Sequence, residues 1–241
     1  MRLLACLVVM FVVAACKAEG TRSSSEPLTI LAASSLTEVL PQLDDDARYE
    51  FAGSDDLALQ LREGARADVF AAASPVYPTE LHEEGVVEDP IVFATNRLVL
   101  IVPAANPGDV HSVDDLDGPD TQLIIGADGV PVGDYTRQIL HNMDATSVLD
   151  GVVSEEEDVK AIVSKVALGE ADAGFVYATD VGSMEGDLLA LELPVEVQPV
   201  VEYMVAVTSD SEQKSEARAF VDRLLSDEGA EALESAGFRT P

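Results

Sequence analysis

Short apolar runs alternate along the chain with segments in which apolar residues recur every three or four positions. Continuous apolar runs favour buried strands, whereas the wider spacing favours one face of a helix. The strands predicted in this way are 28–33, 48–52, 68–72, 97–102, 122–127, 173–177, 188–191 and 201–207. The helices predicted between them are 35–43, 54–63, 77–84, 133–141, 157–168 and 212–236. Strands separated by helices indicate an α/β fold with mainly parallel sheets.

Two long apolar runs, "RLVLIVP" at 97–103 and "VEYMVAV" at 201–207, flank the middle third of the chain. If the chain enters a second lobe through the first run and returns through the second, one lobe is 28–97 plus 205–241 and the other is 98–204. This arrangement predicts a ligand cleft between two α/β lobes, with the two crossing strands as the hinge. A single continuous sheet remains an alternative.

The N-terminus reads as a secretory signal over residues 1–15, because Arg2 is followed by an apolar run and then by small residues. The run is too short to predict a membrane-spanning helix. Its end, Val13–Cys16, resembles the bacterial lipobox, which implies that Cys16 becomes the first mature residue and carries lipid. Residues 16–27 then form the lipidated cysteine and a flexible tether. The alternative is an ordinary signal peptide with an incidental cysteine.

Composition excludes several classes of site. The two cysteines, Cys6 and Cys16, both lie in this N-terminal segment. The folded part therefore has no thiol for a disulfide, a metal site or a nucleophile. The formal net charge is −31, from 45 acidic and 14 basic residues, which disfavours nucleic-acid binding. The acidic residues are spread along the chain, as expected of a solvated acidic surface.

Hydroxyl groups and glycines follow several of the predicted strands. Ser34 and Ser35 follow 28–33, and Ser54 follows Gly53 after 48–52. A helix start offers free backbone N–H groups and about half a positive charge, so it can hold an anion without a cationic side chain. Several such starts converging on one cleft would form a small anion site. Each start taken alone is as well explained by helix capping, and Ser35 with Glu38 fits a capping box.

The chain resembles the periplasmic molybdate-binding proteins of bacterial ABC importers. The resemblance covers about residues 28–238 and rests on "LAASSLTEVL", "FAGSDDLALQLREGARADVFAAAS", "NRLVLIVP", "GVPVGDYTRQIL", "EEDVKAIVSKVALGEADAGFVYATD", "VEYMVAV" and "SAGF". It implies the two-lobed type II periplasmic-binding-protein fold. It also implies a lipid-anchored, extracytoplasmic receptor that hands molybdate or tungstate to an ABC permease, as a monomer and without enzymatic activity or a cofactor.

The same resemblance implies which residues hold the oxyanion, and none of them binds the molybdenum directly. Ser35 and Ser54 correspond to donors through both hydroxyl and backbone N–H. Val132 and Val159 correspond to backbone donors, and Tyr177 corresponds to a hydroxyl donor.

Two features of the chain bear on this site. Asp55 and Asp56 follow Ser54, where many relatives have a serine-rich run, and we expect both carboxylates to point into solvent. If they point inward, they weaken anion binding. Ser154 and Glu157 fit a second capping box, which would start a helix at 155 and leave the Val159 N–H bonded inside it. For Val159 to bind a ligand, this helix must begin near residue 157 or 158.

Other functions remain as alternatives. The same fold could bind sulfate, phosphate or a small organic acid, since pocket size cannot be read from the sequence. A hydrolase is disfavoured because the G-x-S-x-G motif is absent and His82, His111 and His141 lie in polar or helical contexts. A clustered metal-ligand motif is also absent. A structural surface lipoprotein would need no set of converging donors.

Overall fold

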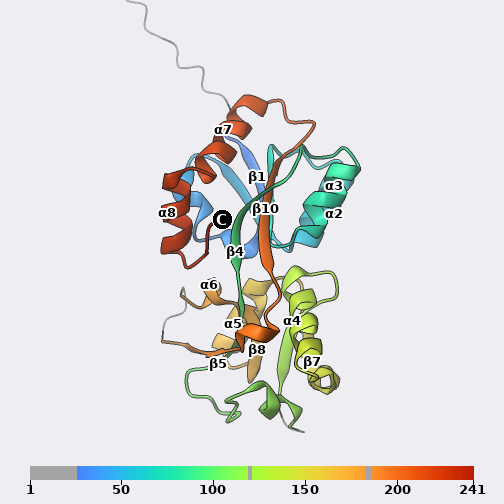
Figure 1. The fold of residues 1–241 in the computed structure, drawn as a ribbon, viewed down its shortest axis with the longest axis vertical. Helices are drawn as coiled ribbons and strands as arrows, with labels where there is room; N and C mark the ends of the chain where they lie inside the picture. Colours follow the sequence, from blue (N-terminus) through green and yellow to red (C-terminus); the bar gives the residue numbers. More distant parts are fainter. Residues whose placement is uncertain (1–25, 119–120, 183–185) are drawn as a thin grey trace, which may run out of the picture.

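The computed structural model describes residues 26–118, 121–182 and 186–241, which form two lobes, each built on a five-stranded sheet (Figure 1). The signal 1–15, Cys16 and nearly all of the tether 16–27 lie outside the described residues, so the lipid anchor stays a prediction. Within the described residues, no helix is long and apolar enough to cross a membrane.

Lobe 1 is the upper lobe in Figure 1, and its sheet has the strand order β2-β1-β3-β10-β4. The strands are β1 (Thr29–Ala33), β2 (Arg48–Ala52), β3 (Val69–Ala72), β4 (Ile91–Asn96) and β10 (Val201–Val207). One face is covered by α2 (Ser54–Arg62) and α3 (Val76–Glu83). The other face carries α1 (Leu40–Leu43), α7 (Lys214–Leu224) and α8 (Asp227–Ser235).

Lobe 2 has a sheet with the strand order β7-β6-β8-β5-β9. The strands are β5 (Leu98–Pro103), β6 (Leu123–Gly126), β7 (Val152–Glu156), β8 (Ala173–Tyr177) and β9 (Leu188–Glu192). Its α-helices are α4 (Pro131–Asn142), α5 (Val159–Ala167) and α6 (Ala178–Val181), and its 3-10 helices include η2 (Val113–Asp117), η3 (Thr146–Gly151) and η5 (Val195–Val197). The continuous apolar run of β5 is buried at every position, because strands flank it on both sides and helices α5 and α6 pack against it.

The α/β two-lobed fold is confirmed, but the sheets are mixed rather than mainly parallel. In each sheet the three strands at one side pair in parallel, β1 with β2 and β3, and β6 with β7 and β8. The remaining pairings, of β10 with β3 and β4 and of β5 with β8 and β9, are antiparallel. The chain leaves lobe 1 at Arg97, between β4 and β5, and returns over residues 193–200, so all of β10 belongs to the first sheet.

Two of the predicted helices are each divided in the structure. The segment 35–43 contains the 3-10 helix η1 (Ser34–Leu36) and the short α1, which has Pro41 in its first turn. Proline cannot continue a helix through its preceding turn, because it lacks an N–H and its ring meets the carbonyl four residues earlier. The segment 212–236 is divided at Ser226, whose side chain caps the start of α8 by accepting from the Gly229 N–H.

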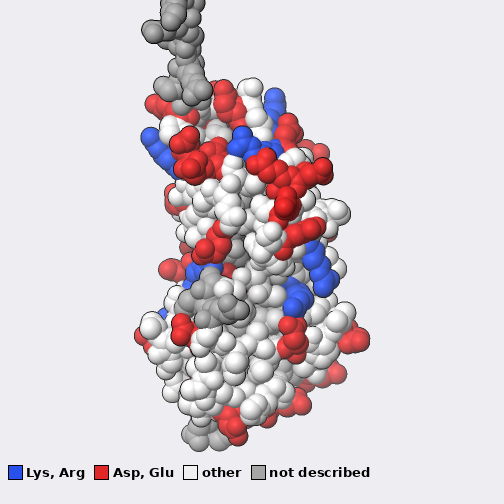
Figure 2. Space-filling view, turned by 90° about the vertical axis from the view of Figure 1, so that its left-hand side faces the viewer, with Lys and Arg blue, Asp and Glu red and all other residues white. Residues whose placement is uncertain are grey.

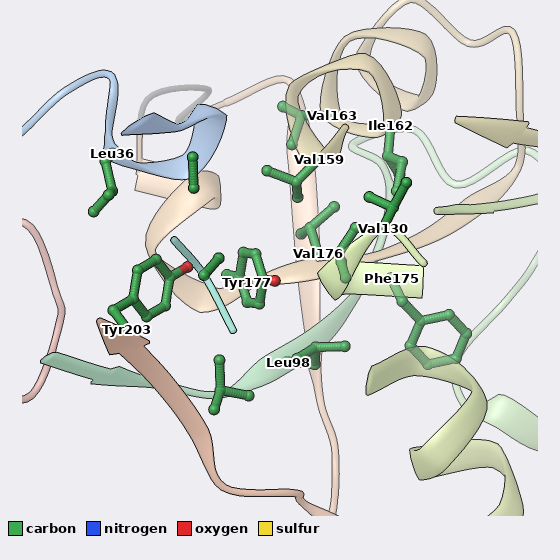
Figure 3. Packing of buried hydrophobic residues seen from close by; sticks show 14 of the residues in the cluster. Leu36, Leu98, Val130, Val159, Ile162, Val163, Phe175, Val176, Tyr177 and Tyr203 are labelled. Atoms are coloured by element: carbon green, nitrogen blue, oxygen red, sulfur yellow. The ribbon is translucent and has the colours of Figure 1, made fainter. Parts of the chain in front are cut away.

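Buried apolar residues form two clusters, a smaller one within lobe 1 and a larger one that runs through both lobes, part of which Figure 3 shows. Leu36 contributes from lobe 1, Val159 and Val176 contribute from lobe 2, and Tyr177 and Tyr203 lie with neighbouring rings between them. The two lobes are therefore in apolar contact beneath the site described next.

The face shown in Figure 2 carries many carboxylates over lobe 1, whereas the middle of lobe 2 is largely uncharged there.

Candidate functional site

A small cavity lies between the lobes, where strand ends and helix starts from both sheets meet. The residues that line it are Ala33, Ser34, Ser35, Ala52, Gly53, Ser54, Ala73, Val130, Pro131, Val132, Asp158, Val159 and Tyr177. All five residues predicted for the site are therefore brought together. The cavity measures about 10 Å³, which is about the smallest space that accommodates one water-sized particle. Any ligand larger than a water molecule therefore requires the walls of this cavity to move apart.

Ser35 lies in η1, directly after β1, and is buried. Its Oγ lies 2.9 Å from the Oη of Tyr203 on β10, so the two hydroxyls are hydrogen-bonded. The capping box expected between Ser35 and Glu38 is not formed, because η1 has Ala33 at its N-cap without a side-chain cap, and Glu38 is exposed. That prediction is wrong: the serine hydroxyl is used for a contact across the sheet rather than for its own helix.

Ser54 is the first residue of α2, after Gly53 at the N-cap, and is only 1% exposed. Its Oγ accepts a hydrogen bond from the backbone N–H of Ala73 at 3.1 Å. A serine oxygen that accepts in this way keeps its own proton available for a second partner. The hydroxyl and the N–H at the helix start can therefore both donate into the cavity.

Val132 lies in the first turn of α4, after Pro131. The start of this helix is held against the end of β6 by two glycines. A Cβ on Gly133 would lie 2.3 Å from the carbonyl oxygen of Gly126, so only glycine permits this approach. The backbone of Val132, which is 1% exposed, is thereby fixed at the cavity wall.

Val159 is the first residue of α5, and Asp158 is its N-cap. The Oδ1 of Asp158 accepts from the Ala161 N–H at 2.9 Å. Ser154 lies in β7, so the second capping box is not formed and a helix start at 155 is wrong. The Val159 N–H belongs to the first turn of a helix, where backbone donors have no acceptor within the helix. The helix therefore begins late enough for the Val159 N–H to bind a ligand, as the sequence analysis required.

Tyr177 ends β8 and is 2% exposed. Burial raises the pKa of its hydroxyl well above the ordinary value of a tyrosine, and the neighbouring Tyr203 and Tyr135 raise it further. The phenol is therefore neutral and keeps its proton. Its Oη is buried and has no hydrogen-bond partner among the described residues. A buried donor without a partner is unfavourable, so this oxygen marks a place where a ligand acceptor would be stabilising.

The charges around the cavity are sparse. Lysine, arginine and histidine are absent from its described lining, and Asp158 is the one charged lining residue in that part of the chain. Across residues 26–118, 121–182 and 186–241, no group of three metal-ligating side chains occurs. His82, His111 and His141 are exposed, as expected. The arrangement suits a ligand that accepts hydrogen bonds and carries the negative charge itself.

The expectation that both acids after Ser54 point into solvent is correct for Asp56 and wrong for Asp55. Asp56 is exposed, but the Oδ1 of Asp55 is buried and lies against Gly53 at the N-cap. Burial raises the pKa of the Asp55 carboxyl, and the charges of Asp56 and Asp134 raise it further. A half-buried acid therefore lies beside the Gly53–Ser54 wall of the cavity, where it disfavours a second negative charge.

Two tyrosines that contact the site were not predicted. Tyr203 supports Ser35, and the Oη of Tyr77 in lobe 1 donates to the carbonyl oxygen of Gly129 in lobe 2. The hydroxyl of a buried tyrosine usually finds a partner. Tyr203 is the one aromatic residue of β10, and this was the only signal in the sequence. The identity of each partner depends on tertiary structure.

Comparison with known proteins agrees with this geometry. The family model "Bacterial extracellular solute-binding protein" matches residues 28–239. The chain belongs to this family. Membership assigns the chain an extracytoplasmic, solute-binding role in transport, and it agrees with the prediction that the chain is not an enzyme.

Individual relatives with named ligands resemble the chain over most of its length. The molybdate-binding protein ModA of Mycobacterium tuberculosis is 33% identical over 232 residues, covering 92% of this chain and 88% of the relative. The periplasmic molybdate-binding protein of Azotobacter vinelandii superposes with a TM-score of 0.77 at 20% identity, covering 89% of this chain and 99% of that chain. The sulfate-binding protein SubI of M. tuberculosis gives 0.75 at 16% identity, covering 90% and 87%. These two structures share the fold.

Proposed function

We propose that this solute-binding protein captures molybdate, and tungstate with it, and delivers the anion to an ABC permease. The observation that carries the proposal is the convergence of Ser35, Ser54, Val132, Val159 and Tyr177 on one small cavity without a lysine, arginine or histidine in its described lining. The named role of the M. tuberculosis relative, at 33% identity, supports the choice of anion.

The chemistry of the donors fits a tetrahedral dianion. Ser35 and Ser54 offer hydroxyl and backbone protons, Val132 and Val159 offer N–H groups at helix starts, and Tyr177 offers a phenol proton. Helix starts add a favourable electrostatic potential for an anion. The charge of the ligand is thus balanced by dipoles, which is compatible with release when the lobes separate about the crossing strands.

The same set of hydrogen-bond donors determines which anions the site favours. A site that presents protons and few acceptors favours a fully ionised anion over a protonated one, because a ligand O–H group would find no acceptor. Asp158 is the one carboxylate in the described lining, and its Oδ1 already accepts from the Ala161 N–H. The scarcity of acceptors therefore disfavours phosphate, which is partly protonated at neutral pH, and leaves sulfate as the second candidate. Sulfate is smaller than molybdate, so the fit of the closed cavity decides between them.

We further propose that the mature chain is a monomer anchored outside the cytoplasm by lipid on Cys16. The residues that support the lipid anchor are the apolar signal and the Val13–Cys16 motif. Two or more acyl chains hold a soluble domain at a membrane, where the permease lies. Replacement of Cys16 by serine should release the protein from membranes. Persistent membrane association of Cys16→Ser would contradict the anchor without affecting the binding site.

Thermal unfolding of the full chain in detergent tests the choice of ligand. Molybdate, tungstate, sulfate and phosphate are added separately, with an equal concentration of chloride as control. A ligand at 100 times its dissociation constant adds about 2.7 kcal/mol, which for a chain of this size raises the midpoint by roughly 5–10 °C. Shifts with molybdate and tungstate alone support the proposal. A shift with sulfate alone keeps the fold and changes the ligand, and no shift with any oxyanion contradicts anion binding.

A further inference from the structure

We propose that Tyr203 is a positioning residue for anion binding: its hydroxyl donates to the Oγ of Ser35, and this directs the serine proton at the bound oxyanion. The inference rests on the proposed function. Tyr203 lies outside the cavity lining, and its proposed role is to orient the Ser35 hydroxyl toward the anion.

The geometry holds the phenol in place. Tyr203 lies on β10, opposite Ala94 of β4, and the pairing of these strands shifts register between Tyr203 and Met204. The shift leaves Phe93 of β4 without a paired residue on β10. The Tyr203 ring is fully buried and makes edge contacts with Phe93, Tyr177 and Phe238 at centroid distances of 6.1, 5.7 and 5.2 Å. It therefore has little freedom to turn its hydroxyl away from Ser35.

The direction of the hydrogen bond follows from the partners. Burial raises the pKa of Tyr203 well above its ordinary value, and the charge of Asp180 raises it further, so the phenol keeps its proton. When the Ser35 hydroxyl donates to an anion, its oxygen can only accept from Tyr203. A phenol is also a stronger hydrogen-bond donor than an aliphatic hydroxyl. The 2.9 Å contact then runs from Tyr203 to Ser35 to the ligand.

Ser54 is arranged in the same way from the other side of the cavity. Its oxygen accepts from the Ala73 N–H, which leaves its proton for the ligand. In both serines a protein donor occupies the acceptor side of the hydroxyl. The pair is thereby set to donate, which suits an anion and disfavours a ligand that must itself donate.

Calorimetric titration of the full chain with molybdate tests the inference. Tyr203→Phe removes one oxygen and should lower the affinity by about 3- to 10-fold, as expected for one hydrogen bond. In a Ser35→Ala background the same change should alter the affinity less than about 2-fold, because the proton it directs is already absent. Tyr49→Phe is the matched control, since the Tyr49 hydroxyl donates to the Leu40 and Asp44 carbonyls away from the cavity.

The outcomes separate this inference from the proposed function. A wild-type chain that binds no oxyanion overturns both. Wild-type binding with unchanged affinity in Tyr203→Phe overturns only the role of Tyr203. An equal loss with and without the Ser35 hydroxyl also overturns it, because Tyr203 would then act independently of Ser35.

A second measurement needs no change at Tyr203, in case that variant does not fold. In Tyr177→Phe, saturating molybdate should still perturb the near-ultraviolet absorbance of tyrosine, because the Tyr203 phenol donates more strongly once Ser35 donates to the ligand. The additional change Ser35→Ala should remove most of this difference spectrum. A difference spectrum that is independent of Ser35, or absent with molybdate bound, contradicts the proposal.

Discussion

The Cα of Gly53 in lobe 1 faces the backbone carbonyl of Glu157 in lobe 2 so closely that a Cβ on Gly53 would lie 2.6 Å from that oxygen. Gly53 has φ −59°, which any residue adopts. The requirement for glycine is therefore steric, and it comes both from the opposite lobe and from the Oδ1 of Asp55, which the Cβ would also approach to 2.6 Å. This contact joins the turn before Ser54 to the residue before the Asp158 cap, so it couples the two walls of the cavity.

Gly53→Ala is expected to weaken molybdate binding because the added methyl group obstructs closure of the lobes. Overpacking of this kind costs about 1–3 kcal/mol, or roughly a 5- to 150-fold loss of affinity. Titration calorimetry measures it. Gly182→Ala is the matched control, because Gly182 has φ −59° and a Cβ there meets no atom within 4 Å. Equal affinities of the two variants would show that the lobes do not approach in this way in the bound state.

Tyr177→Phe should have opposite effects on binding and on stability. The Tyr177 hydroxyl is buried without a partner among the described residues, so its removal should leave the ligand-free free energy of unfolding unchanged or slightly higher. Loss of a donor to a charged ligand should weaken molybdate binding by about 1.5–3 kcal/mol. Urea unfolding without ligand and calorimetry with ligand measure the two quantities. A matching loss of stability would identify Tyr177 as a core residue alone.

Asp55→Asn should tighten molybdate binding, because it removes a half-buried negative charge beside Ser54. We expect an increase of about 2- to 10-fold at low salt that shrinks as ionic strength rises. The increase should also shrink as the pH falls, since the raised pKa of Asp55 means that its carboxyl is protonated earlier than an ordinary one. Asp56→Asn provides the control, because the Asp56 side chain is exposed. An equal gain in both variants would indicate a general charge effect.

Asp180 should make stability fall as pH rises through mildly acidic values. Burial raises its pKa from 3.8 to about 6, against the opposing effect of Lys160, whose Nζ lies 3.1 Å from Oδ1. The folded state therefore holds this proton more tightly than the unfolded state does. The added stability is complete below about pH 4 and is lost as the pH rises through about 6. Its size is on the order of 3 kcal/mol.

Asp180→Asn isolates this contribution, since the other acids remain in both proteins. Urea midpoints at pH 4, 5, 6 and 7 should show wild type losing stability relative to the variant between pH 4 and 6. The two curves should then run in parallel above pH 7. Parallel curves over the whole range would contradict a raised pKa for Asp180.

The fold class and the segments that line the cleft could be predicted from the sequence, because buried strands and helix starts have strong local patterns. The apolar positions Val159, Ile162, Val163 and Val166 recur at helical spacing, and all four are buried in α5. The serines after β1 and β2 were visible for the same reason. The hydrogen bonds that these serine hydroxyls make with other strands could not be predicted from the sequence.

Ser35 illustrates that limit. Its local sequence matches a capping box with Glu38, yet its hydroxyl bonds to Tyr203, 168 residues away. Asp55 is a second case, since a carboxylate in a first turn is compatible with solvent or with the cleft, and the approach of lobe 2 decides between them. Both errors arise where a long-range contact competes with a local motif of similar energy.

The place of β10 in the sheet has a consequence for the order in which the chain folds. Every strand of the lobe 2 sheet lies within Leu98–Glu192, so that sheet can be complete before the C-terminal region is available. The lobe 1 sheet has β10 inserted between β3 and β4, and it stays divided until residue 207 is available. The lobe that begins first along the chain therefore folds last, and the cavity is assembled only when Tyr203 arrives beneath Ser35.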